Sequence, residues 1–400
     1  MVREVIISIY LLAFKLVFNL FKIFPMKNKI TFVVSFGDNS KYVYDEIVNQ
    51  QLDIEVSVLY KGKSDRYFQD DEGIKLIPFE STNIIHTLLS IYHLATSKKI
   101  IIDNYFGFLA VTDFKNEVEV IQLWHASGAI KKFGLEDQSV QYRSARAQQR
   151  FLKVYEKFDK VIVGSDVMAN TFMSAFNLSS ERILRTGIPR TDFFYDEDMK
   201  KNIVTRFSAE NHNLQNKKKI LYAPTYRDNE LNNFQLTLEL DQMQVQLGDD
   251  YIVLLRLHPA VQTSINFAEK YPGFVYDYSG SQYDINDLLL FADLLVTDYS
   301  SIPFEFSLMN KPMIFFAYDL EAYQRERGLM SHYEKMVPGP VVGSTNELIN
   351  IIQTEKYDYK LIQEYASKWN KYSTGHSSRR LVQYMFEHSD VAEESKRRAL

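Results

Sequence analysis

The chain has 400 residues, of which 46% are hydrophobic and 24% are charged, so it can bury a sizeable core and belongs to neither the disordered nor the fibrous class. A single core usually stops growing at about 250 residues, so this length predicts two domains of similar size. The absence of cysteine excludes disulfides, thiolate nucleophiles and cysteine-ligated metal sites, and the net charge of −5 argues against nucleic acid as a partner.

The first element predicted along the chain is an amphipathic helix within residues 1–29. Residues 5–24 are apolar enough to suggest a membrane span, but Lys15 and Lys22 interrupt them, and a charge near the bilayer centre costs about 2.5 kcal/mol or more. At 3.6 residues per turn these lysines share one helical face. The apolar side chains on the opposite face include Leu12, Phe18 and Phe21.

This pattern is typical of a helix that lies in the membrane interface, and Lys27 and Lys29 follow it to meet anionic headgroups. One alternative is a core helix of the first domain. A signal peptide is disfavoured, because no small-residue cleavage site follows the apolar run.

The rest of the chain alternates short β-branched runs with longer helical stretches, which predicts βαβ repetition and parallel sheets. Residues 195–219 are polar and lack a sustained apolar period, so we place the connection between the domains there. The predicted strands are residues 30–36, 54–60, 99–103, 118–124 and 160–164 before this connection, and residues 220–223, 251–257, 294–297 and 313–316 after it.

These elements predict an α/β protein with two Rossmann-like, doubly wound domains at residues 30–200 and 201–365. Residues 366–400 are expected to form a helical segment that packs back on the first domain. Two such domains that face a central cleft bring the carboxyl ends of their strands, and hence their ligands, to the interface.

Polar side chains follow several of the predicted strands. His125 sits where a strand gives way to a glycine-containing loop, followed by Lys131 and Lys132, and an imidazole there is suited to act as a general base. Arg227 lies in a loop that Pro224 starts, and its guanidinium could clamp a phosphate. A structural histidine and a surface loop formed by Arg227 and Asp228 are the alternatives.

Two further strand ends have the same character. His258 ends an apolar strand, and Pro259 biases it away from helical geometry. Ser300 and Ser301 lie between a strand and a predicted helix, where they could bind an anion or simply cap the helix. No glycine-rich dinucleotide fingerprint or Walker motif is present, which argues against NAD and ATP.

A basic cluster is predicted on a helix after the His125 loop. The spacing places most of its members near one side, where they could contact a diphosphate or anionic lipid. A solvated helix face is the alternative. The cluster comprises Arg143, Arg146, Arg150 and Lys153.

These segments, in content and order, resemble the CDP-glycerol glycerophosphotransferases of wall teichoic acid synthesis. The resemblance rests on WHASG at residues 124–128 with KKFG after it, YAPTYRD at 222–228, LHP at 257–259 and TDYSSIPFEF at 297–306. It extends over nearly the whole chain. Within the family, the amphipathic first helix, DNYF at 103–106 and FGLED at 133–137 are similar to the primases, which add the first glycerol phosphate. Ala126 favours this reading, because the polymerases commonly have glycine after the histidine.

The resemblance implies a glycosyltransferase B-like fold and an enzyme on the cytoplasmic face of the cell membrane. One glycerol phosphate would pass from CDP-glycerol to the N-acetylmannosamine of an undecaprenyl-diphosphate-linked disaccharide, with release of CMP. CDP-glycerol is the donor substrate, no tightly bound cofactor or metal is expected, and other teichoic acid enzymes are possible partners.

The implied roles divide the candidate residues into four groups. The catalytic group is His125, His258 and Asp103, with Asp103 as an alternative base. The donor-phosphate group is Arg227, Thr297, Asp298, Ser300, Ser301 and Glu305. The group for the acceptor or the lipid diphosphate is Ser127, Lys131, Lys132, Arg143, Arg146 and Arg150. The membrane group is Leu12, Lys15, Phe18, Phe21 and Lys22.

Three other functions stay open on the residues alone. A polyol-phosphate polymerase of the same family would use CDP-glycerol or CDP-ribitol and add many units. A nucleotide-sugar glycosyltransferase of the same architecture would transfer a sugar and release UDP or GDP. A catalytically inert membrane scaffold would need neither histidine nor the serine turn, so the presence of all four segments disfavours it.

Overall fold

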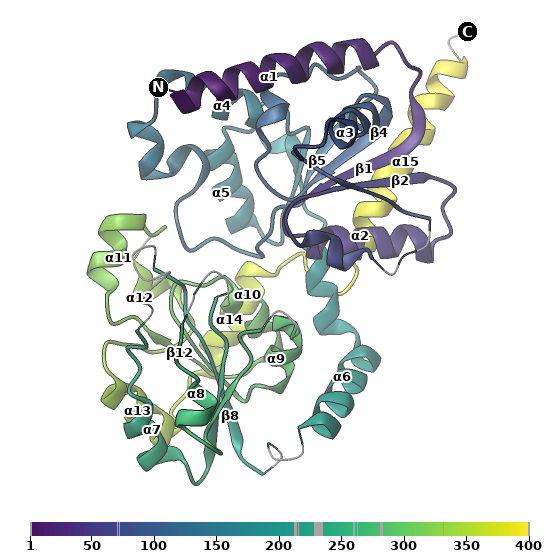
Figure 1. The fold of residues 1–400 in the computed structure, drawn as a ribbon. Coiled ribbons are helices and arrows are strands. Elements are labelled where there is room, and N and C mark those ends of the chain that lie inside the picture. The colour runs from purple at the N-terminus through teal and green to yellow at the C-terminus, as the bar shows by residue number, and fades with distance from the viewer. Residues whose placement is uncertain are drawn as a thin grey trace. The chain divides into compact units, whose positions relative to one another are not determined.

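The structure is a computed structural model that describes residues 2–69, 71, 73–211, 214, 216–227, 235–258, 261, 263–280, 283–330 and 332–398 (Figure 1). The chain forms two compact units. Unit 1 comprises Met1–Ser127, Phe133–Asp192 and Lys371–Leu400, and unit 2 comprises Gly128–Lys132 and Phe193–Asn370. The domain boundaries predicted from the sequence were residues 200 and 365, and the packing of the short segment after Ser127 with unit 2 was not predicted.

Unit 1 contains one parallel sheet of seven strands in the order β3-β2-β1-β4-β5-β6-β7. The order reverses between β1 and β4, and ligands of doubly wound sheets bind outside the carboxyl ends of the strands at such a point. The strands are β1 Lys27–Val34, β2 Glu55–Tyr60, β3 Lys75–Pro78, β4 Ser97–Ile102, β5 Glu119–Gln122, β6 Lys160–Ile162 and β7 Ile183–Leu184.

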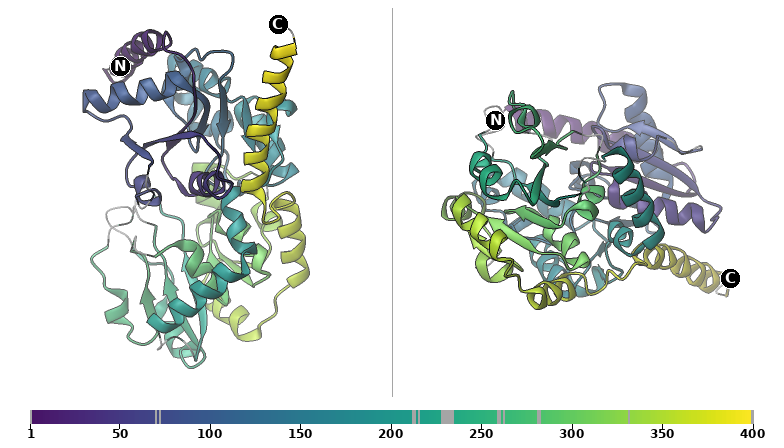
Figure 2. Two further views of the ribbon diagram at one scale, coloured as in Figure 1. Left: turned by 90° about the vertical axis from the view of Figure 1, so that its right-hand side faces the viewer. Right: turned by 90° about the horizontal axis from the view of Figure 1, so that it is seen from below.

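Helices pack against this sheet through buried apolar side chains. Leu381, Val382 and Met385 of α15 join Val43 and Ile47 of α2 in the core beneath the strands, and α15 lies beside α2 in Figures 1 and 2. The helices of unit 1 are α1 Val2–Phe21, α2 Asp38–Asn49, α3 Ile84–Thr96, α4 Ala145–Tyr155, α5 Asp166–Phe176 and α15 Ser377–Arg398.

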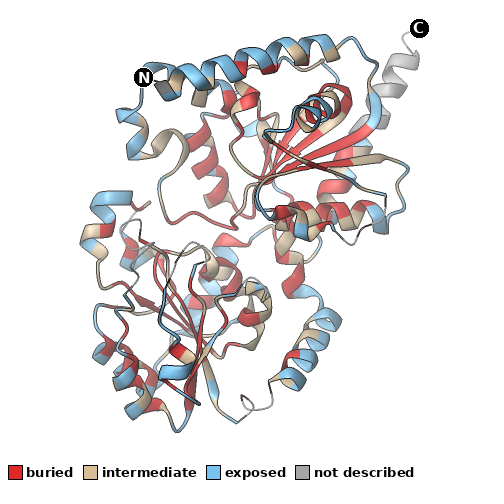
Figure 3. Cartoon of the chain, viewed as in Figure 1, coloured by how far each residue is buried: buried red, intermediate tan, exposed pale blue. Residues whose placement is uncertain are grey.

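Helix α1 has two different apolar faces. Leu11, Phe14 and Phe18 are buried against the unit, where the Phe18 ring lies 5.3 Å from that of Phe114. A second apolar face is exposed along the outside of the helix (Figure 3) and comprises Val5, Ile6, Ile9, Leu12, Leu16 and Leu20. Residues Arg3–Phe21 could cross a membrane by length and composition alone, a test that core helices and signal sequences also pass.

The residues expected to contact the membrane therefore differ in their exposure. Leu12 and Lys15 are exposed, whereas Phe21 and Lys22 are half-buried and Phe18 is fully buried, so Phe18 cannot contact a lipid surface. Lys29 was expected at the headgroups, but it is fully buried in β1 and donates to Thr96 Oγ1 at 2.7 Å.

Unit 2 contains a parallel sheet of six strands in the order β10-β9-β8-β11-β12-β13, with its reversal between β8 and β11. The strands are β8 Lys218–Ala223, β9 Tyr251–Leu255, β10 Val275–Asp277, β11 Leu294–Thr297, β12 Met313–Phe316 and β13 Val341–Val342. The helices are α6 Glu197–Glu210, α7 Leu240–Leu247, α8 Phe267–Lys270, α9 Ile285–Phe291, α10 Ile302–Phe306, α11 Leu320–Arg327, α12 Tyr333–Met336, α13 Thr345–Thr354 and α14 Tyr359–Trp369.

The polar stretch predicted as a connection contains a helix. Asp196 caps α6 by accepting a hydrogen bond from the Met199 N–H at 2.8 Å, and Phe207 is the residue of α6 that is buried. A helix with so small an apolar face gives little periodic signal, which explains why it was not predicted.

Candidate active site

His125 follows β5 through a turn with an unusual backbone conformation. Trp124 has a φ of 57°, in the left-handed region that bulky residues rarely adopt. Gln122, the last residue of β5, holds the turn with both ends of its amide: Oε1 accepts from the Trp124 N–H at 2.8 Å, and Nε2 donates to the Asn104 carbonyl at 3.0 Å.

The imidazole of His125 lies between two aromatic rings. The Phe36 centroid is 4.1 Å away and the Trp124 centroid 4.3 Å away, with interplanar angles of 15° and 27°. Nδ1 lies 3.2 Å from the Asp103 carbonyl oxygen. Because a carbonyl can only accept, Nδ1 carries the proton and Nε2 has a free lone pair. Burial lowers the pKa of His125 to about 4, so the ring is neutral near pH 7 and can accept a proton.

Asp103 was the alternative base, but its carboxylate supports the backbone instead. It is fully buried at the end of β4, and it accepts hydrogen bonds from the N–H groups of Ser35, Phe36 and Gly37 at 2.8, 2.9 and 2.8 Å. These N–H groups lower its pKa, while the larger effect of burial raises it to about 7. With both oxygens engaged and no exposed surface, Asp103 holds the loop after β1 rather than taking a proton from a substrate.

Arg227 is a second case in which the structure gives a predicted residue another role. Its Nε and Nη2 donate to Asp319 at 2.7 and 2.9 Å, Nη2 also donates to Asp298 at 3.1 Å, and Nη1 donates to the Thr225 carbonyl at 2.6 Å. The side chain is 9% exposed. Since protein acceptors take most of its N–H groups, Arg227 braces the strand ends of unit 2 and is poorly placed to clamp a phosphate.

In the turn after β11, some side chains are bonded within the protein, whereas Ser301 makes no capping hydrogen bond. Thr297 and Asp298 are buried, and they bind the Ala223 carbonyl and the Thr225 N–H at 2.7 and 2.8 Å. Ser300 accepts from the Ile302 N–H at 3.2 Å, as a capping residue does, whereas the Ser301 side chain makes no capping bond to α10. Both serines are half-buried, and Glu305 is buried in α10.

His258 is exposed after β9, with its ring 4.5 Å from that of Tyr226. Burial of part of the ring, and then the charges of Lys131 and Arg256, lower its pKa. Lys131 belongs to unit 2 because Ile130 and Lys132 pair with Met330 and Gly328 through backbone hydrogen bonds of 2.8 and 3.2 Å.

The Lys131 ammonium lies 5.3 Å from the centre of the Tyr323 ring, while Lys132 is exposed. Lys131 and His258 therefore place two cationic or ionisable groups at one end of the sheet of unit 2. Asp228 and Pro259, the neighbours of Arg227 and His258 in the sequence motifs, lie outside the described residues.

The remaining residues expected at the acceptor are in unit 1. Ser127 is fully buried. Arg150 makes two hydrogen bonds to the Glu4 carboxylate of α1, at 3.1 and 3.3 Å, so it ties α4 to α1. Arg146 is exposed, and the Arg143 guanidinium lies 5.4 Å from the centre of the Phe151 ring. Of the three arginines, Arg143 and Arg146 are the ones still suited to meet an anionic ligand.

Sequence reasoning missed the residues around His125. Asp38 and Asn39 begin α2 just after β1, and Arg190 Nη1 contacts Asp38 and the His125 carbonyl at 2.6 and 3.0 Å. The available signal was the polar Gly37-Asp38-Asn39 run directly after a predicted strand, the same feature that singled out the other strand ends.

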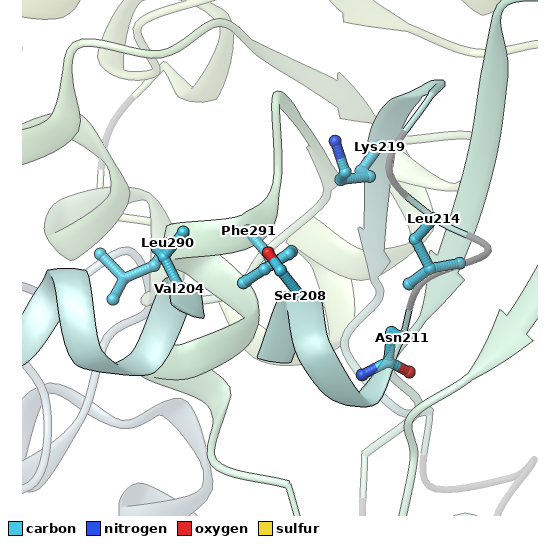
Figure 4. Close-up of a pocket in the computed structure, with 7 residues that line it drawn as sticks. All are labelled: Val204, Ser208, Asn211, Leu214, Lys219, Leu290 and Phe291. Atoms are coloured by element: carbon cyan, nitrogen blue, oxygen red, sulfur yellow. The ribbon is translucent and has the colours of Figure 1, made fainter. Parts of the chain in front are cut away.

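A cavity of about 220 Å³ lies elsewhere in unit 2, between α6, α9 and the start of β8 (Figure 4). Its polar groups include Lys219, whose ammonium is paired with Asp293 at 3.3 Å. Because Lys219 is near the amino end of β8, this cavity is remote from the carboxyl ends of the strands. Among the residues that the structure describes, no group of three or more histidine or acidic side chains could hold a metal ion.

Comparison with known proteins agrees with this architecture. A family model described as CDP-Glycerol:Poly(glycerophosphate) glycerophosphotransferase matches residues 16–387. The teichoic acid glycerol-phosphate primase of Bacillus subtilis (strain 168) is 38% identical over 360 residues, which cover 90% of this chain and 92% of that protein. The teichoic acid poly(ribitol-phosphate) polymerase of Bacillus spizizenii (strain W23) is 33% identical over 378 residues, covering 92% of this chain and 58% of that protein.

Among solved structures, a variant of the wall teichoic acid polymerase TagF matches with a TM-score of 0.80, covering 99% of each chain at 21% identity. A Staphylococcus aureus MnaA structure with UDP matches with a TM-score of 0.58, covering 91% of this chain and 97% of that chain at 16% identity. These likenesses confirm the glycosyltransferase B-like fold of two parallel-sheet domains. The match over most of its length shows that the chain is a transferase that belongs to the CDP-glycerol:poly(glycerophosphate) glycerophosphotransferase family.

Proposed function

We propose that this protein is a teichoic acid primase. It transfers one glycerol phosphate from CDP-glycerol to the N-acetylmannosamine of an undecaprenyl-diphosphate-linked disaccharide and releases CMP. The choice of a primase is supported by the 38% identity with the Bacillus subtilis glycerol-phosphate primase over about nine-tenths of both chains. CDP-glycerol as donor is supported by the family description and by the soak of TagF with CDPG.

The observation that carries the chemistry is the fixed, neutral imidazole of His125, whose Nε2 is the proton acceptor. Nε2 takes the proton of the acceptor hydroxyl while the hydroxyl oxygen bonds to the phosphorus that bears glycerol. The bond from that phosphorus to the bridging oxygen of the diphosphate breaks, and the electron pair leaves with CMP. His258, Lys131 and the serines after β11 are assigned to the donor, where cations and N–H groups stabilise the phosphate charge.

We also propose that the enzyme binds the cytoplasmic membrane surface peripherally. The exposed apolar face of α1 supplies burial into lipid, and Lys15 supplies attraction to anionic headgroups. Helix α3 packs on α1 and exposes Ile84, Ile85, Leu88 and Leu89. A peripheral mode is supported by the burial of the opposite face of α1 in unit 1, because a spanning helix would have to give up those contacts.

Product analysis by mass spectrometry tests the proposed reaction, with CDP-glycerol and a short-chain analogue of the lipid-linked disaccharide. The expected products are CMP and an acceptor that is heavier by one glycerol phosphate. A ladder of additions would identify a polymerase instead, an alternative that the 33% identity with the Bacillus spizizenii polymerase keeps open. Sugar transfer from a UDP or GDP donor would identify a glycosyltransferase.

A further inference from the structure

The backbone turn that carries His125 stores conformational strain. Trp124, directly before it, has a φ of 57°, and this left-handed conformation brings the Cβ of a residue too close to the following carbonyl oxygen. Such residues persist only where the surrounding structure holds them, and they cluster at functional sites. The groups that hold this turn are therefore candidates for a role in the reaction.

Three side chains bind three backbone groups of Trp124 and His125 in this turn. The Trp124 N–H donates to Gln122 Oε1 at 2.8 Å. The Trp124 carbonyl accepts from Asn39 Nδ2 at 3.0 Å, and the His125 carbonyl accepts from Arg190 Nη1 at 3.0 Å. The backbone on both sides of the His125 Cα is thus fixed by side chains from β5, from α2 and from the segment after β7.

Asn39, Asp38 and Arg190 are also bound to each other. Asn39 is fully buried, and its Oδ1 accepts from the Arg190 N–H at 3.1 Å. The Asp38 carboxylate accepts from Arg190 Nη1 at 2.6 Å. Arg190 therefore reaches the His125 carbonyl from a position that α2 determines, rather than as a free surface side chain.

We propose that Arg190, held by Asp38 and Asn39, is a positioning residue that keeps His125 in its reactive orientation. This inference rests on the proposed function, in which His125 is the general base. Arg190 acts through the backbone carbonyl and touches no reacting atom. Its removal would let the Trp124 turn relax toward an unstrained backbone and would turn Nε2 away from the acceptor hydroxyl.

The charges around the imidazole make this role measurable. The groups that face His125 are the backbone carbonyl of Asp103 after β4, the Asp38 carboxylate from α2 and the Arg190 guanidinium from the segment after β7. Burial has the largest effect on the pKa of His125 and lowers it. Of the two nearby charges, Arg190 lowers this pKa further and Asp38 raises it. Replacing Arg190 with glutamine removes its positive charge and leaves the negative charge of Asp38 beside the imidazole, so the pKa of His125 should rise.

The experiment compares Arg190→Gln and Arg190→Lys with the native enzyme. For Arg190→Gln we expect kcat to fall by at least tenfold while the affinity for CDP-glycerol stays unchanged. The acidic limb of the pH–rate profile should move to higher pH, because a positive charge beside the imidazole is gone. The double variant Arg190→Gln with Asp38→Asn should return the limb toward its native position without restoring kcat, because both charges are gone but the hydrogen bond to the His125 carbonyl is still missing.

Arg190→Lys keeps the positive charge but loses the forked hydrogen-bonding geometry of the guanidinium. We therefore expect the acidic limb of its pH–rate profile to stay at the native position while kcat is reduced. Arg185→Gln is the matched control, because Arg185 is an exposed arginine of unit 1 paired with Asp166 on the surface. It should leave kcat and the pH limb unchanged. A native kcat in Arg190→Gln, or an unmoved limb with a loss of activity that only follows a fall in Tm, would overturn the proposal.

Histidine NMR separates this inference from the proposed function. The His125 resonance, assigned by its loss in His125→Gln, should titrate at a higher pH in Arg190→Gln than in the native protein. This readout needs no substrate. If the native protein released no CMP from CDP-glycerol, the proposed function would fail while the titration would still decide whether Arg190 acts on His125.

Discussion

Replacing Leu16 with glutamate should abolish most of the binding to anionic vesicles. Leu16 is 63% exposed on the outer face of α1, and full burial of a leucine side chain contributes about 1.5–3 kcal/mol. Moving the exposed part into lipid is then worth about 1–2 kcal/mol, or roughly tenfold in the partition constant. Leu16→Ala should lose up to that amount, and Leu16→Glu should lose more because its carboxylate must be desolvated near anionic headgroups.

Vesicle sedimentation measures this effect, with phosphatidylglycerol vesicles compared with neutral phosphatidylcholine vesicles. Binding should weaken as salt rises, because headgroup attraction to Lys15 is screened. Val245→Glu is the matched control, since Val245 is 86% exposed on α7 of unit 2 and has no assigned contact with lipid. This control should bind vesicles as the native protein does.

Phe18 provides the opposite comparison within the same helix. It is fully buried against the unit, so Phe18→Ala should lower the free energy of unfolding by about 3–5 kcal/mol. Native vesicle binding by Leu16→Glu would refute the assignment of the outer face to lipid. Extraction by detergent alone, in both the native protein and Leu16→Glu, would instead indicate a spanning helix.

The remaining predictions concern individual residues of the two units. His125→Ala should lower kcat by ~100- to 10,000-fold with CDP-glycerol affinity retained in calorimetry. The native rate should persist down to mildly acidic pH and fall as pH drops through about 4, where His125 becomes protonated. Arg227→Ala leaves two carboxylates unpaired and should lower the free energy of unfolding of unit 2 by about 3–5 kcal/mol, so a native Tm would contradict its bracing role. Lys131→Gln should raise the Kd for CDP-glycerol about tenfold or more. Lys132→Gln, at the exposed neighbouring position, should leave this Kd unchanged. Equal effects of the two substitutions would contradict the assignment of Lys131 to donor binding.

The central strands were predictable because buried parallel strands read as continuous apolar runs. Residues 294–297 and 313–316 coincide with β11 and β12, and the first strands of both sheets were found with small errors at their ends. The strands β3, β7, β10 and β13 were missed. Each has two to four residues and lies at an edge of its sheet, so the local signal is short and tertiary pairing decides it.

The strand-end positions of the candidate site residues were also predictable, but the hydrogen-bond partners that their side chains have in the fold were not. Arg227 was found from its loop, yet its main partner Asp319 lies 92 residues further along the chain. The same limit applies to α1, where period alone showed an apolar side but not its division into a face on the protein and a face toward solvent. Such assignments depend on contacts that are distant in sequence.

The two units share a buried aspartate at equivalent places in their sheets, and this equivalence helps to compare the roles of the two histidines. In each sheet a buried aspartate follows the strand beyond the reversal and binds the loop after the first strand: Asp103 accepts from the Gly37 N–H, and Asp298 from the Thr225 N–H, both at 2.8 Å. The histidines do not share this equivalence, because His125 follows β5 on one side of the reversal and His258 follows β9 on the other.

Their surroundings differ as well. His125 is enclosed by aromatic rings and has its tautomer fixed by a carbonyl, which are the conditions for a proton acceptor. His258 is exposed and sits near the charges of Lys131 and Arg256, so a bound diphosphate would neutralise the local positive charge and raise the pKa of His258 toward the protonated form. An exchange of roles would place the phosphate ligand between aromatic rings, so we assign proton removal to His125 and charge stabilisation to His258.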